Sequence, residues 1–364
     1  MKKHLYLLFL SSFFAVAQIP AGYYNNATGT GFTLKTQLKT IINPHTQLVY
    51  GSGLWSLFQT SDLRPNGYVW DIYSNCNFVF GAVVNGGQQD DGTQGNAECQ
   101  RYNKEHTFPK SWFGGQIYPM YSDAFIVMPA DKKDNAMRGS IVYATVSPSV
   151  TTTYGNGFKI GNCATPNYPY TSQGLQVLEP SDEFKGDFAR NYFYVATCYE
   201  DAIASWQTLD PNGNTILDGS SDKVFEQWYL DMLFSWHLAD PVSQKEIDRN
   251  NAIYAVQGNR NPFIDHPEYA QLIWGSLLKK EVFDNAFSSL SVFPNPSNNH
   301  SVSISCTLLL DNIQLYAING QLLQELEHPL LNNNTYTIND IPKGFYFLKI
   351  NANNQSVIKK IIIE

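Results

Sequence analysis

The chain has 364 residues, of which 43% are hydrophobic and 15% are charged, and its formal net charge is −8 at pH 7. This length exceeds one typical hydrophobic core, so two or more domains are expected in a globular protein. The acidic balance excludes a protein that binds nucleic acid through overall positive charge, so binding of a polyanion must use a local basic strip or a metal ion.

Residues 1–17 have the pattern of a signal peptide. A basic start at residues 2–4 precedes an apolar run at 5–16, and Ala-Val-Ala at 15–17 gives a small-x-small cleavage pattern, so Gln18 should begin the mature chain. A membrane anchor is the weaker alternative, because the run is shorter than the roughly 20 residues that span a bilayer. No later stretch is long and apolar enough, so we expect no transmembrane segment after cleavage.

The cysteines indicate how the exported chain is cross-linked, since export permits disulfides. The chain has five, Cys76, Cys99, Cys163, Cys198 and Cys306, so at least one stays free if every bridge is internal. We take Cys76–Cys99 and Cys163–Cys198 as working pairs, although the sequence alone leaves the connectivity open. The lack of a CxxC motif and of clustered His and Cys residues disfavours a structural zinc site.

The N-terminal half combines one clear helix with much loop. Apolar residues at helical spacing predict a helix over 33–42 with Thr33 as its N-cap. Residues 69–73 have the pattern of a short strand, and residues 84–96, rich in Gly, Asn, Gln and Asp, have that of a loop. Residues 139–180 mix short β-prone runs with Gly, Pro and Asn, which predicts mostly loop.

The stretch from 187 to 278 is predicted to be helical. Apolar and aromatic residues recur at helical spacing over residues 187–206, 225–237, 242–256 and 267–278. The second helix is very aromatic and is therefore expected to be buried. Gly, Asn and Pro at residues 258–262 are expected to end the third of these helices.

The composition changes near residue 286, where the helical pattern stops. Short alternating runs separated by turn signals predict strands over residues 302–309, 312–316, 336–338, 344–350 and 356–363. The sequence therefore predicts an α+β domain over residues 18–285 and a small all-β sandwich over residues 286–364. The second domain has no cluster of catalytic side chains.

Residues 104–138 hold the side chains that best suit phosphodiester hydrolysis. His106 is the candidate general base, because neutral imidazole titrates near the operating pH. Glu105 and Asn135 offer the oxygen ligands that Mg²⁺ or Ca²⁺ prefers, and a metal there would polarise a phosphate and stabilise the leaving 3′-oxygen. Arg138 lies three residues after Asn135, so a helix would place it on the same face, where it would meet a phosphate oxygen.

These residues also have simpler interpretations. A Glu-His pair is most often a surface pair, and Asn135 with Arg138 is most often a solvated helix face. Adjacent residues on a regular strand point to opposite faces, so Glu105 and His106 can serve one site only if the strand twists or ends there. Pro109 makes such an end plausible.

Residues from about 20 to 280 resemble the secreted endonuclease I family of ββα-metal (His-Me finger) nucleases. Residues 105–109 match the Glu-His-x-x-Pro core of that family. Its Asp-(x)₅-Pro-(x)₅-Asn-x-x-Arg pattern is matched at Asp123, Pro129, Asn135 and Arg138. Residues 186–190 resemble a family helix start, and residues 240–262 resemble its closing segment.

The resemblance implies a non-specific endonuclease that cuts DNA, and often RNA, leaving 5′-phosphate and 3′-hydroxyl ends. It implies that His106 is the general base and that Arg138 is a catalytic residue contacting phosphate. It also implies that Glu105 and Asn135 ligate one Mg²⁺, with Ca²⁺ or Mn²⁺ as substitutes.

Two departures from the family pattern affect the expected site. The family often has a polar pair where this chain has Phe125-Ile126, which puts support from polar groups around the site in doubt. No arginine lies between His106 and Arg138, so an arginine for the product phosphate must come from elsewhere. The candidates for phosphate binding are Lys110, Arg190 and Arg249.

The C-terminal domain resembles the sorting domain of type IX secretion. Residues 292–296 (Val-Phe-Pro-Asn-Pro) match its opening, and residues 344–350 and 359–363 match its closing strands. This resemblance implies recognition by the type IX secretion machinery, passage across the outer membrane and removal of the domain. An ordinary β-sandwich binding module is the alternative.

The sequence as a whole predicts a secreted or cell-surface, metal-dependent endonuclease with an appended sorting domain. One rival hypothesis is a nucleic-acid-binding or surface-binding protein that kept the fold and lost activity, for which Phe125-Ile126 is the best support. A second rival is a metal-dependent phosphoesterase acting on other substrates.

Overall fold

The computed structural model describes residues 19–169, 174–278, 290–306, 310–317, 321–329, 331, 335–352 and 355–364. The chain divides into two compact units, residues 1–278 and 279–364, and each has its own hydrophobic core. The predicted signal peptide and the expected boundary at 285/286 lie outside the described residues. Within the described ranges, no helix has both the length and the apolar character needed to cross a bilayer.

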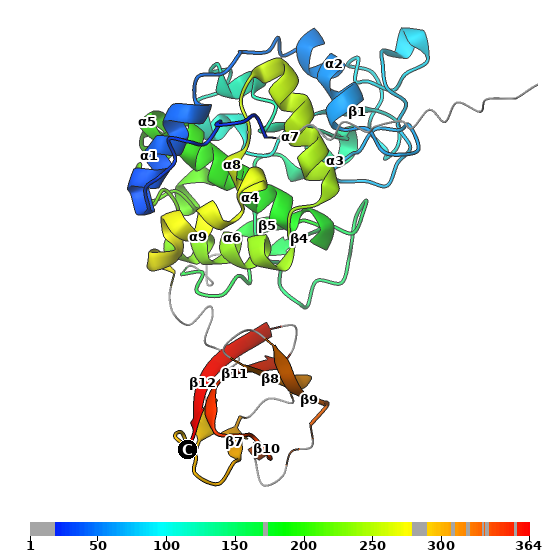
Figure 1. The fold of residues 1–364 in the computed structure, drawn as a ribbon. Helices are drawn as coiled ribbons and strands as arrows, with labels where there is room; N and C mark the ends of the chain where they lie inside the picture. The colour runs from blue at the N-terminus through cyan, green and yellow to red at the C-terminus, as the bar shows by residue number, and fades with distance from the viewer. Residues whose placement is uncertain are drawn as a thin grey trace, which may run out of the picture. The chain divides into compact units, whose positions relative to one another are not determined.

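The first unit is mainly helical (Figure 1). Its helices are α1 (Gly31–Ile42), α2 (Ser52–Ser61), α3 (Lys132–Arg138), α4 (Asp182–Cys198), α5 (Glu200–Ile203), α6 (Gln227–Ala239), α7 (Gln244–Gln257), α8 (Pro262–Asp265) and α9 (Glu268–Trp274). Short 3₁₀ turns are η1 (Val83–Asn85), η2 (Lys110–Phe113), η3 (Met120–Ser122), η5 (Ala204–Trp206), η6 (Gly213–Thr215) and η7 (Gly275–Leu277). Every α4 residue from Gly186 to Cys198 is buried, so this helix forms the centre of the core.

Two small sheets complete the first unit. Strands β1 (Tyr102–His106) and β2 (Val127–Asp131) pair antiparallel, and α3 follows β2 directly, which gives a ββα arrangement. Strands β3 (Val142–Tyr143), β4 (Lys159–Asn162) and β5 (Gln176–Glu179) form a second sheet in the order β3-β5-β4. These sheets among the helices confirm the predicted α+β fold.

Local sequence explains where helix α3 begins and where helix α7 begins and ends. Asp131 caps α3, because its side chain accepts hydrogen bonds from the backbone N–H groups of Lys133 and Asp134. Ser243 and Glu246 form a capping box at the start of α7. Gly258 ends α7 with φ +82°, a conformation that glycine adopts without steric cost.

Several predicted boundaries are wrong. The first helix begins at Gly31, with Thr30 rather than Thr33 at the N-cap position. The helix predicted over 187–206 begins at Asp182 and ends at Cys198, because the chain leaves α-helical geometry at Tyr199. Residues 69–73 form no named strand within the described chain, and Val69 makes only an isolated bridge.

The second unit is a β-sandwich, as predicted (Figure 1). Its strands are β6 (Ser291–Phe293), β7 (Val302–Ser305), β8 (Asn312–Ala317), β9 (Leu322–Glu327), β10 (Thr335–Ile338), β11 (Gly344–Ala352) and β12 (Gln355–Ile363). They form sheets of order β10-β7-β6 and β12-β11-β8-β9. On β11, Tyr346, Leu348 and Ile350 are buried while Phe345 and Phe347 are exposed, which is the alternation expected of a strand with one face in the core.

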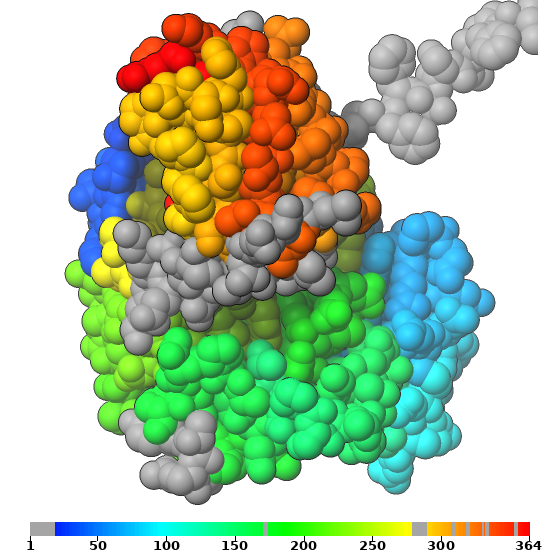
Figure 2. All heavy atoms as spheres, turned by 90° about the horizontal axis from the view of Figure 1, so that it is seen from below, coloured from blue at the N-terminus to red at the C-terminus, as the bar shows by residue number. Residues whose placement is uncertain are grey.

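One of the two working disulfides is present. Cys76 and Cys99 are bonded, whereas Cys163 and Cys198 are free thiols, so that second pairing is wrong. Cys198 is buried at the end of α4, where its thiol lies 3.9 Å from the carbonyl of Ile42. The Cys76–Cys99 bond closes a loop-rich segment on one side of the first unit, light blue to cyan in Figure 2. Closing a loop of this length contributes about 3 kcal/mol to stability.

Candidate active site

The His106 imidazole at the end of β1 has one nitrogen occupied. Its Nε2 lies 3.0 Å from the carbonyl oxygen of Tyr121, and a carbonyl only accepts hydrogen bonds, so we assign the proton to Nε2 and the lone pair to Nδ1. Burial lowers the pKa of His106 to about 4, and the nearby charges of Lys110, Arg138 and Lys104 act in the same direction. The ring is therefore neutral near pH 7, which is the form that a general base needs.

Aromatic rings fix the plane of this imidazole. The Tyr121 ring lies 5.2 Å from the His106 ring at an interplanar angle of 19°, and the Tyr50 ring lies 5.7 Å away at 12°. The Tyr50 and Tyr121 rings stack on each other at 4.1 Å. Such stacking restricts rotation of the imidazole.

Two lysines accompany these rings. The Lys104 ammonium lies 3.5 Å from the Trp55 ring centroid and 4.8 Å from that of Tyr50. The Lys110 ammonium lies 5.9 Å from the Tyr121 ring, and Lys110 is exposed. We call Tyr50, Trp55, Lys104, Lys110 and Tyr121 the basic–aromatic strip.

Glu105 is a buried carboxylate with one oxygen held by side-chain donors. Its Oε1 accepts from the hydroxyls of Tyr73 at 2.7 Å and Tyr143 at 3.4 Å, and from Nη1 of Arg138 at 2.9 Å. All three side-chain donors meet Oε1, and no side-chain hydrogen bond to Oε2 is found among the described residues. Burial raises the pKa of Glu105, while the Arg138 charge and the tyrosine hydroxyls oppose that rise.

The Asn135 carboxamide is fixed in the orientation that a metal ligand needs. Its Nδ2 donates to Oδ1 of Asn103 at 2.7 Å and to the carbonyl of Lys104 at 3.4 Å. Both bonds use the amide nitrogen, so Oδ1 stays available as an acceptor. The contact with Lys104 places the amide beside Glu105, the next residue on β1. Glu105 Oε2 and Asn135 Oδ1 are both hard oxygens, the ligand type that an ion such as Mg²⁺ prefers.

Arg138 does not have the surroundings of a phosphate-binding residue. It is only 1% exposed, and its Nη1 donates to Glu105 Oε1 and to the carbonyl of His106. Its Nη2 donates to the carbonyl of Thr107, also at 2.9 Å. The guanidinium therefore holds the end of β1 and the Glu105 carboxylate, and its phosphate contact stays a prediction that these bonds do not favour.

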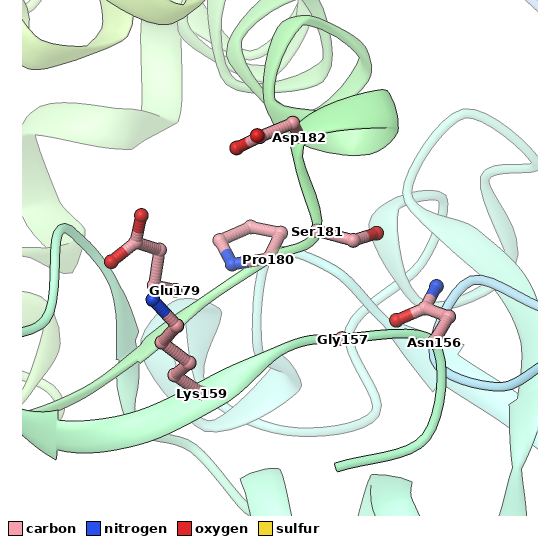
Figure 3. A pocket seen from close by; sticks show the side chains of 7 residues that line it. All are labelled: Asn156, Gly157, Lys159, Glu179, Pro180, Ser181 and Asp182. Carbon is pink, nitrogen blue, oxygen red and sulfur yellow. The ribbon is translucent and has the colours of Figure 1, made fainter. Parts of the chain in front are cut away.

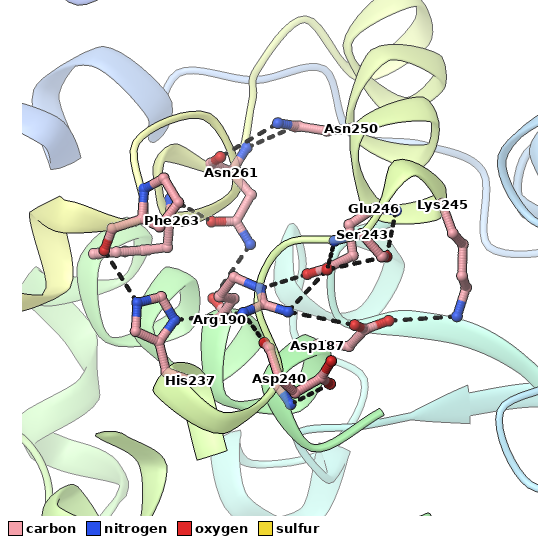
Figure 4. Close-up of polar contacts among 12 residues, drawn as sticks. Asp187, Arg190, His237, Asp240, Ser243, Lys245, Glu246, Asn250, Asn261 and Phe263 are labelled. Atoms are coloured by element: carbon pink, nitrogen blue, oxygen red, sulfur yellow. Dashed lines mark hydrogen bonds and ion pairs between the residues drawn. The ribbon is translucent and has the colours of Figure 1, made fainter. Parts of the chain in front are cut away.

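Arg190 likewise lies in a structural network, and its phosphate contact stays a prediction that this burial does not favour. It is fully buried in α4 and donates from Nε and Nη2 to the two carboxylate oxygens of Glu246, and from Nη1 to the carbonyl of Asp240 (Figure 4). Asp187 and Lys245 extend this network. These contacts tie α4 to the start of α7.

The third phosphate candidate, Arg249, is also buried and paired, so its phosphate contact likewise stays a prediction. Its Nε donates to Asp62 at 2.8 Å, and its Nη2 donates to the carbonyls of Ala124 and Val127. These bonds join α7 to α2 and to the start of β2. Of the predicted phosphate-binding residues, Lys110 is the one whose charge is exposed close to His106.

Asp123, the first position of the matched pattern, is a buried hydrogen-bonding hub. Its oxygens accept from the backbone N–H of Phe125 and from the side chains of Gln257, Tyr194 and Tyr199. In the described residues, ligand atoms of His45, Asp123 and Cys198 lie within 4.8 Å of one another. A carboxylate has about four acceptor positions and four donors occupy them here, so we interpret the group as a hub that fixes the turn after Tyr121.

Phe125 and Ile126 are core residues. The Phe125 ring lies 4.6 Å from the Tyr194 ring, and the Ile126 carbonyl accepts from the backbone N–H and hydroxyl of Thr107. The His106 ring takes its orientation from the Tyr121 carbonyl and does not need a polar side chain at position 125 or 126. This packing weakens the hypothesis that the apolar pair marks a lost activity.

Four groups of the site were not predicted from the sequence: the hydroxyls of Tyr73 and Tyr143, the Asn103 carboxamide and the Tyr121 carbonyl. Tyr73 and Tyr143 lie 32 and 38 residues from the Glu105 carboxylate that they contact. No local spacing relates residues so far apart, and a backbone carbonyl carries no sequence signal.

A pocket of about 280 Å³ lies elsewhere in the first unit, lined by Asn156, Gly157, Lys159, Glu179, Pro180, Ser181 and Asp182 (Figure 3). Lysine and carboxylate side chains share its wall, and none of the predicted site residues lines it. The pocket therefore gives no support to a second nuclease centre.

Comparisons with known proteins agree with this geometry. Residues 30–268 match the family described as Endonuclease I, and residues 291–364 match the Secretion system C-terminal sorting domain. The chain is 33% identical over 258 residues to an "Extracellular ribonuclease" of Bacillus amyloliquefaciens, covering 69% of this chain and 78% of that one. A protein of the same name from Bacillus subtilis (strain 168) is 35% identical with the same coverage. An "Endonuclease-1" of Buchnera aphidicola is 27% identical over 143 residues, covering 39% of this chain and 44% of that one.

Proposed function

This chain belongs to the endonuclease I family and is secreted or carried at the cell surface, and we propose that it hydrolyses phosphodiester bonds of nucleic acids with His106 as the general base. The observation that carries this proposal is the state of His106. The imidazole is neutral, its Nε2–H is held by a carbonyl, and its Nδ1 keeps a lone pair. Such a nitrogen can accept a proton from a water molecule as that water attacks phosphorus.

Glu105 and Asn135 would hold the divalent metal ion, through Oε2 and Oδ1. When bound, Mg²⁺ supplies positive charge that polarises the phosphate and stabilises the leaving 3′-oxygen, so the products carry 5′-phosphate and 3′-hydroxyl ends. Ca²⁺ or Mn²⁺ suits the same oxygen donors. Arg138, Tyr73 and Tyr143 fix the carboxylate that the ion requires.

The substrate we propose is DNA, and RNA as well, cut with little sequence preference. The basic–aromatic strip supports this breadth, because its lysines would meet phosphates and its rings would meet bases, and neither kind of contact distinguishes one sequence from another. The name of the two Bacillus relatives supports RNA as a substrate. The name of the Buchnera relative fits a nuclease that cuts within a chain.

The test compares His106→Ala with the parent and with His266→Ala, a control histidine at the surface beside Glu268. Cleavage of plasmid DNA and of a single-stranded RNA is measured with Mg²⁺ and with EDTA. We expect the parent and the control to cut only with Mg²⁺, and His106→Ala to be slower by about 10²–10⁴-fold, the usual contribution of a general base. Cleavage at the parent rate by a folded His106→Ala protein would remove His106 from the mechanism.

A further inference from the structure

Asp134 is a buried carboxylate in the site's own helix with neither oxygen paired. The residue is 0% exposed, and among the residues that the structure describes no hydrogen bond reaches its Oδ1 or Oδ2. An ionised carboxylate here lacks donors, and a protonated one would lack an acceptor for its hydroxyl. Leaving such a group without a partner is unfavourable, and more so when it is charged, so a small polar species should pair with it.

The Asp134 side chain meets the turn at Gly155. Successive residues on a helix point about 100° apart, so Asn135 contacts β1 while Asp134 points elsewhere. A methyl group added at Gly155 would lie 2.8 Å from Asp134 Oδ2 and 2.0 Å from the carbonyl oxygen of Tyr73. The Asp134 carboxylate and the Tyr73 carbonyl therefore both lie close to Gly155. The Tyr73 carbonyl accepts one hydrogen bond, from the N–H of Asn156, and keeps a second lone pair.

The charges around Asp134 favour a cation. The carboxylates of Asp131, Glu98 and Asp71 and the ammonium of Lys133 are the charges acting on it, and Lys133 is already paired with Glu98 at 3.0 Å.

The neighbouring carboxylates accept three hydrogen bonds each, unlike Asp134. Asp71 accepts from the N–H groups of Tyr73 and Asp131 and from the Ser74 hydroxyl. Asp131 accepts from the N–H groups of Cys99, Lys133 and Asp134. Asp71 and Asp131 contribute negative potential, and the oxygens of Asp134 are the ones that can coordinate a cation.

We propose that the Asp134 carboxylate and the Tyr73 carbonyl hold a structural divalent cation, separate from the metal ion at Glu105 and Asn135. Both groups offer the hard oxygen ligands that Ca²⁺ prefers, with water completing the six to eight ligands this ion takes. The Asn156 side-chain oxygen, buried without a donor in the described chain, is a further ligand within reach of the same turn. Extracellular Ca²⁺ modules bind at about 10⁻⁴–10⁻³ M, and this range suits an exported protein.

This cation would link the fold to the active site. It would join α3, which carries Asn135, to the segment of Tyr73, whose hydroxyl holds Glu105. Its binding would therefore stabilise the arrangement of the two catalytic metal ligands while contributing no group to the reaction.

The test uses the full chain with the catalytic metal site silenced by Asn135→Ala. Ca²⁺ binding is measured by calorimetry, and the thermal midpoint is measured with Ca²⁺ and with EDTA. In this background we expect one bound Ca²⁺ and a higher midpoint with Ca²⁺, because a ligand that binds only the folded state stabilises it. Adding Asp134→Asn should abolish both effects. Adding Asp182→Asn, which removes an exposed carboxylate on α4, should leave both unchanged.

The midpoint in EDTA guards against a variant that fails to fold. If Asp134→Asn is unstable in EDTA, Asp134→Leu, which replaces the unpaired carboxylate by an apolar group of similar size, takes its place. The proposal is overturned if the Asn135→Ala protein binds no Ca²⁺, or if the added Asp134 substitution leaves Ca²⁺ binding unchanged. Either result would mean that water alone pairs with Asp134. A parent that binds Ca²⁺ only through Asp134 would instead count against the catalytic metal site.

Discussion

At the scale of single residues, the chemistry of the site depends on which atoms the neighbours leave without a partner. Tyr121 occupies one nitrogen of His106, and three donors meet one oxygen of Glu105. The amide nitrogen of Asn135 is fixed in the same way by Asn103. Each functional side chain is thus oriented through its other polar atom, and the atom that would act is left available.

Removing one of these orienting donors should weaken metal binding more than it changes chemistry. In Tyr73→Phe, Oε1 of Glu105 loses its shortest side-chain hydrogen bond while the ring packing remains. Partners of this kind contribute about 10–100-fold to metal affinity. We expect the Mg²⁺ concentration for half-maximal cleavage to rise by that factor, with the rate at saturating Mg²⁺ close to the parent. Tyr118→Phe, at an exposed tyrosine, is the control. Equal Mg²⁺ dependence in parent and Tyr73→Phe would show that Glu105 needs no support from Tyr73.

Arg138 and Lys110 should have opposite phenotypes, although both are cations near His106. Arg138→Leu removes one partner of a buried pair at 2.9 Å, and this typically destabilises a protein by about 3–5 kcal/mol. Lys110→Ala should leave stability unchanged and lower the slope of log affinity against log salt by about one, because Lys110 is exposed and we propose it as the phosphate contact. Urea unfolding and the salt dependence of DNA binding measure the two effects. A stable Arg138→Leu protein with a reduced salt slope would restore the phosphate role of Arg138.

At the scale of elements, regular patterns were predictable and long-range contacts were not. Five strands of the β-sandwich and helices α6, α7 and α9 were predicted within a few residues, because their apolar periodicity is local. Strands β6 and β9 of the sandwich were not predicted. Helix α2 was not predicted from the sequence, and at ten residues it is a short helix. The motif places His106, Glu105 and Asn135 in one proposed site, and the structure brings the Asn135 amide to β1 beside Glu105.

The roles of the arginines could not be predicted from the sequence. A motif gives the position of an arginine, and only packing decides whether its guanidinium reaches solvent or is consumed by buried carbonyls and carboxylates. Arg138, Arg190 and Arg249 all proved to be 4% exposed or less.

The contact between α4, α6 and α9 should make stability depend on pH through His237. Its Nε2 lies 3.1 Å from the carbonyl of Pro267, and burial, together with the Arg190 charge, lowers the pKa of His237 to about 4 (Figure 4). In the unfolded chain this histidine has a pKa near 6.5, so between about pH 4 and pH 6.5 the unfolded chain binds more protons than the folded chain. The free energy of unfolding is therefore at its full value above about pH 6.5 and falls as the pH drops towards 4. The loss should amount to about 2–3 kcal/mol.

The variant His237→Gln keeps a side-chain donor for the Pro267 carbonyl and cannot titrate. We expect urea unfolding between pH 4 and pH 6.5 to show a flatter dependence than in the parent, and the difference between the two proteins isolates His237 from neighbouring carboxylates. His266→Gln, at a more exposed histidine, should keep the parent's dependence. If both variants behave as the parent does, His237 is accessible to protons in the folded state.

At the scale of the whole molecule, the two units, each with its own hydrophobic core, carry different functions. The proposed active-site residues lie in the first unit, and the match to a sorting domain covers residues 291–364 in the second. The sorting-domain match and the extracellular relatives confirm the predicted secreted or cell-surface location. Because each core is built from its own unit's residues, the second unit should be dispensable for folding of the first.

Deleting residues 286–364 should therefore separate export from catalysis. The purified truncated protein should unfold with the parent's cooperativity and cut DNA at the parent's rate, because His106, Glu105 and Asn135 and their partners all precede residue 279. In a bacterium with a type IX secretion system, the truncated protein should stay inside the cell envelope while the full chain reaches the medium or the cell surface. Activity assays on purified protein and on cell fractions measure the two effects. A truncated protein that folds and yet fails to cut would mean that the sandwich contributes to the active site, and one that is still exported would remove its sorting role.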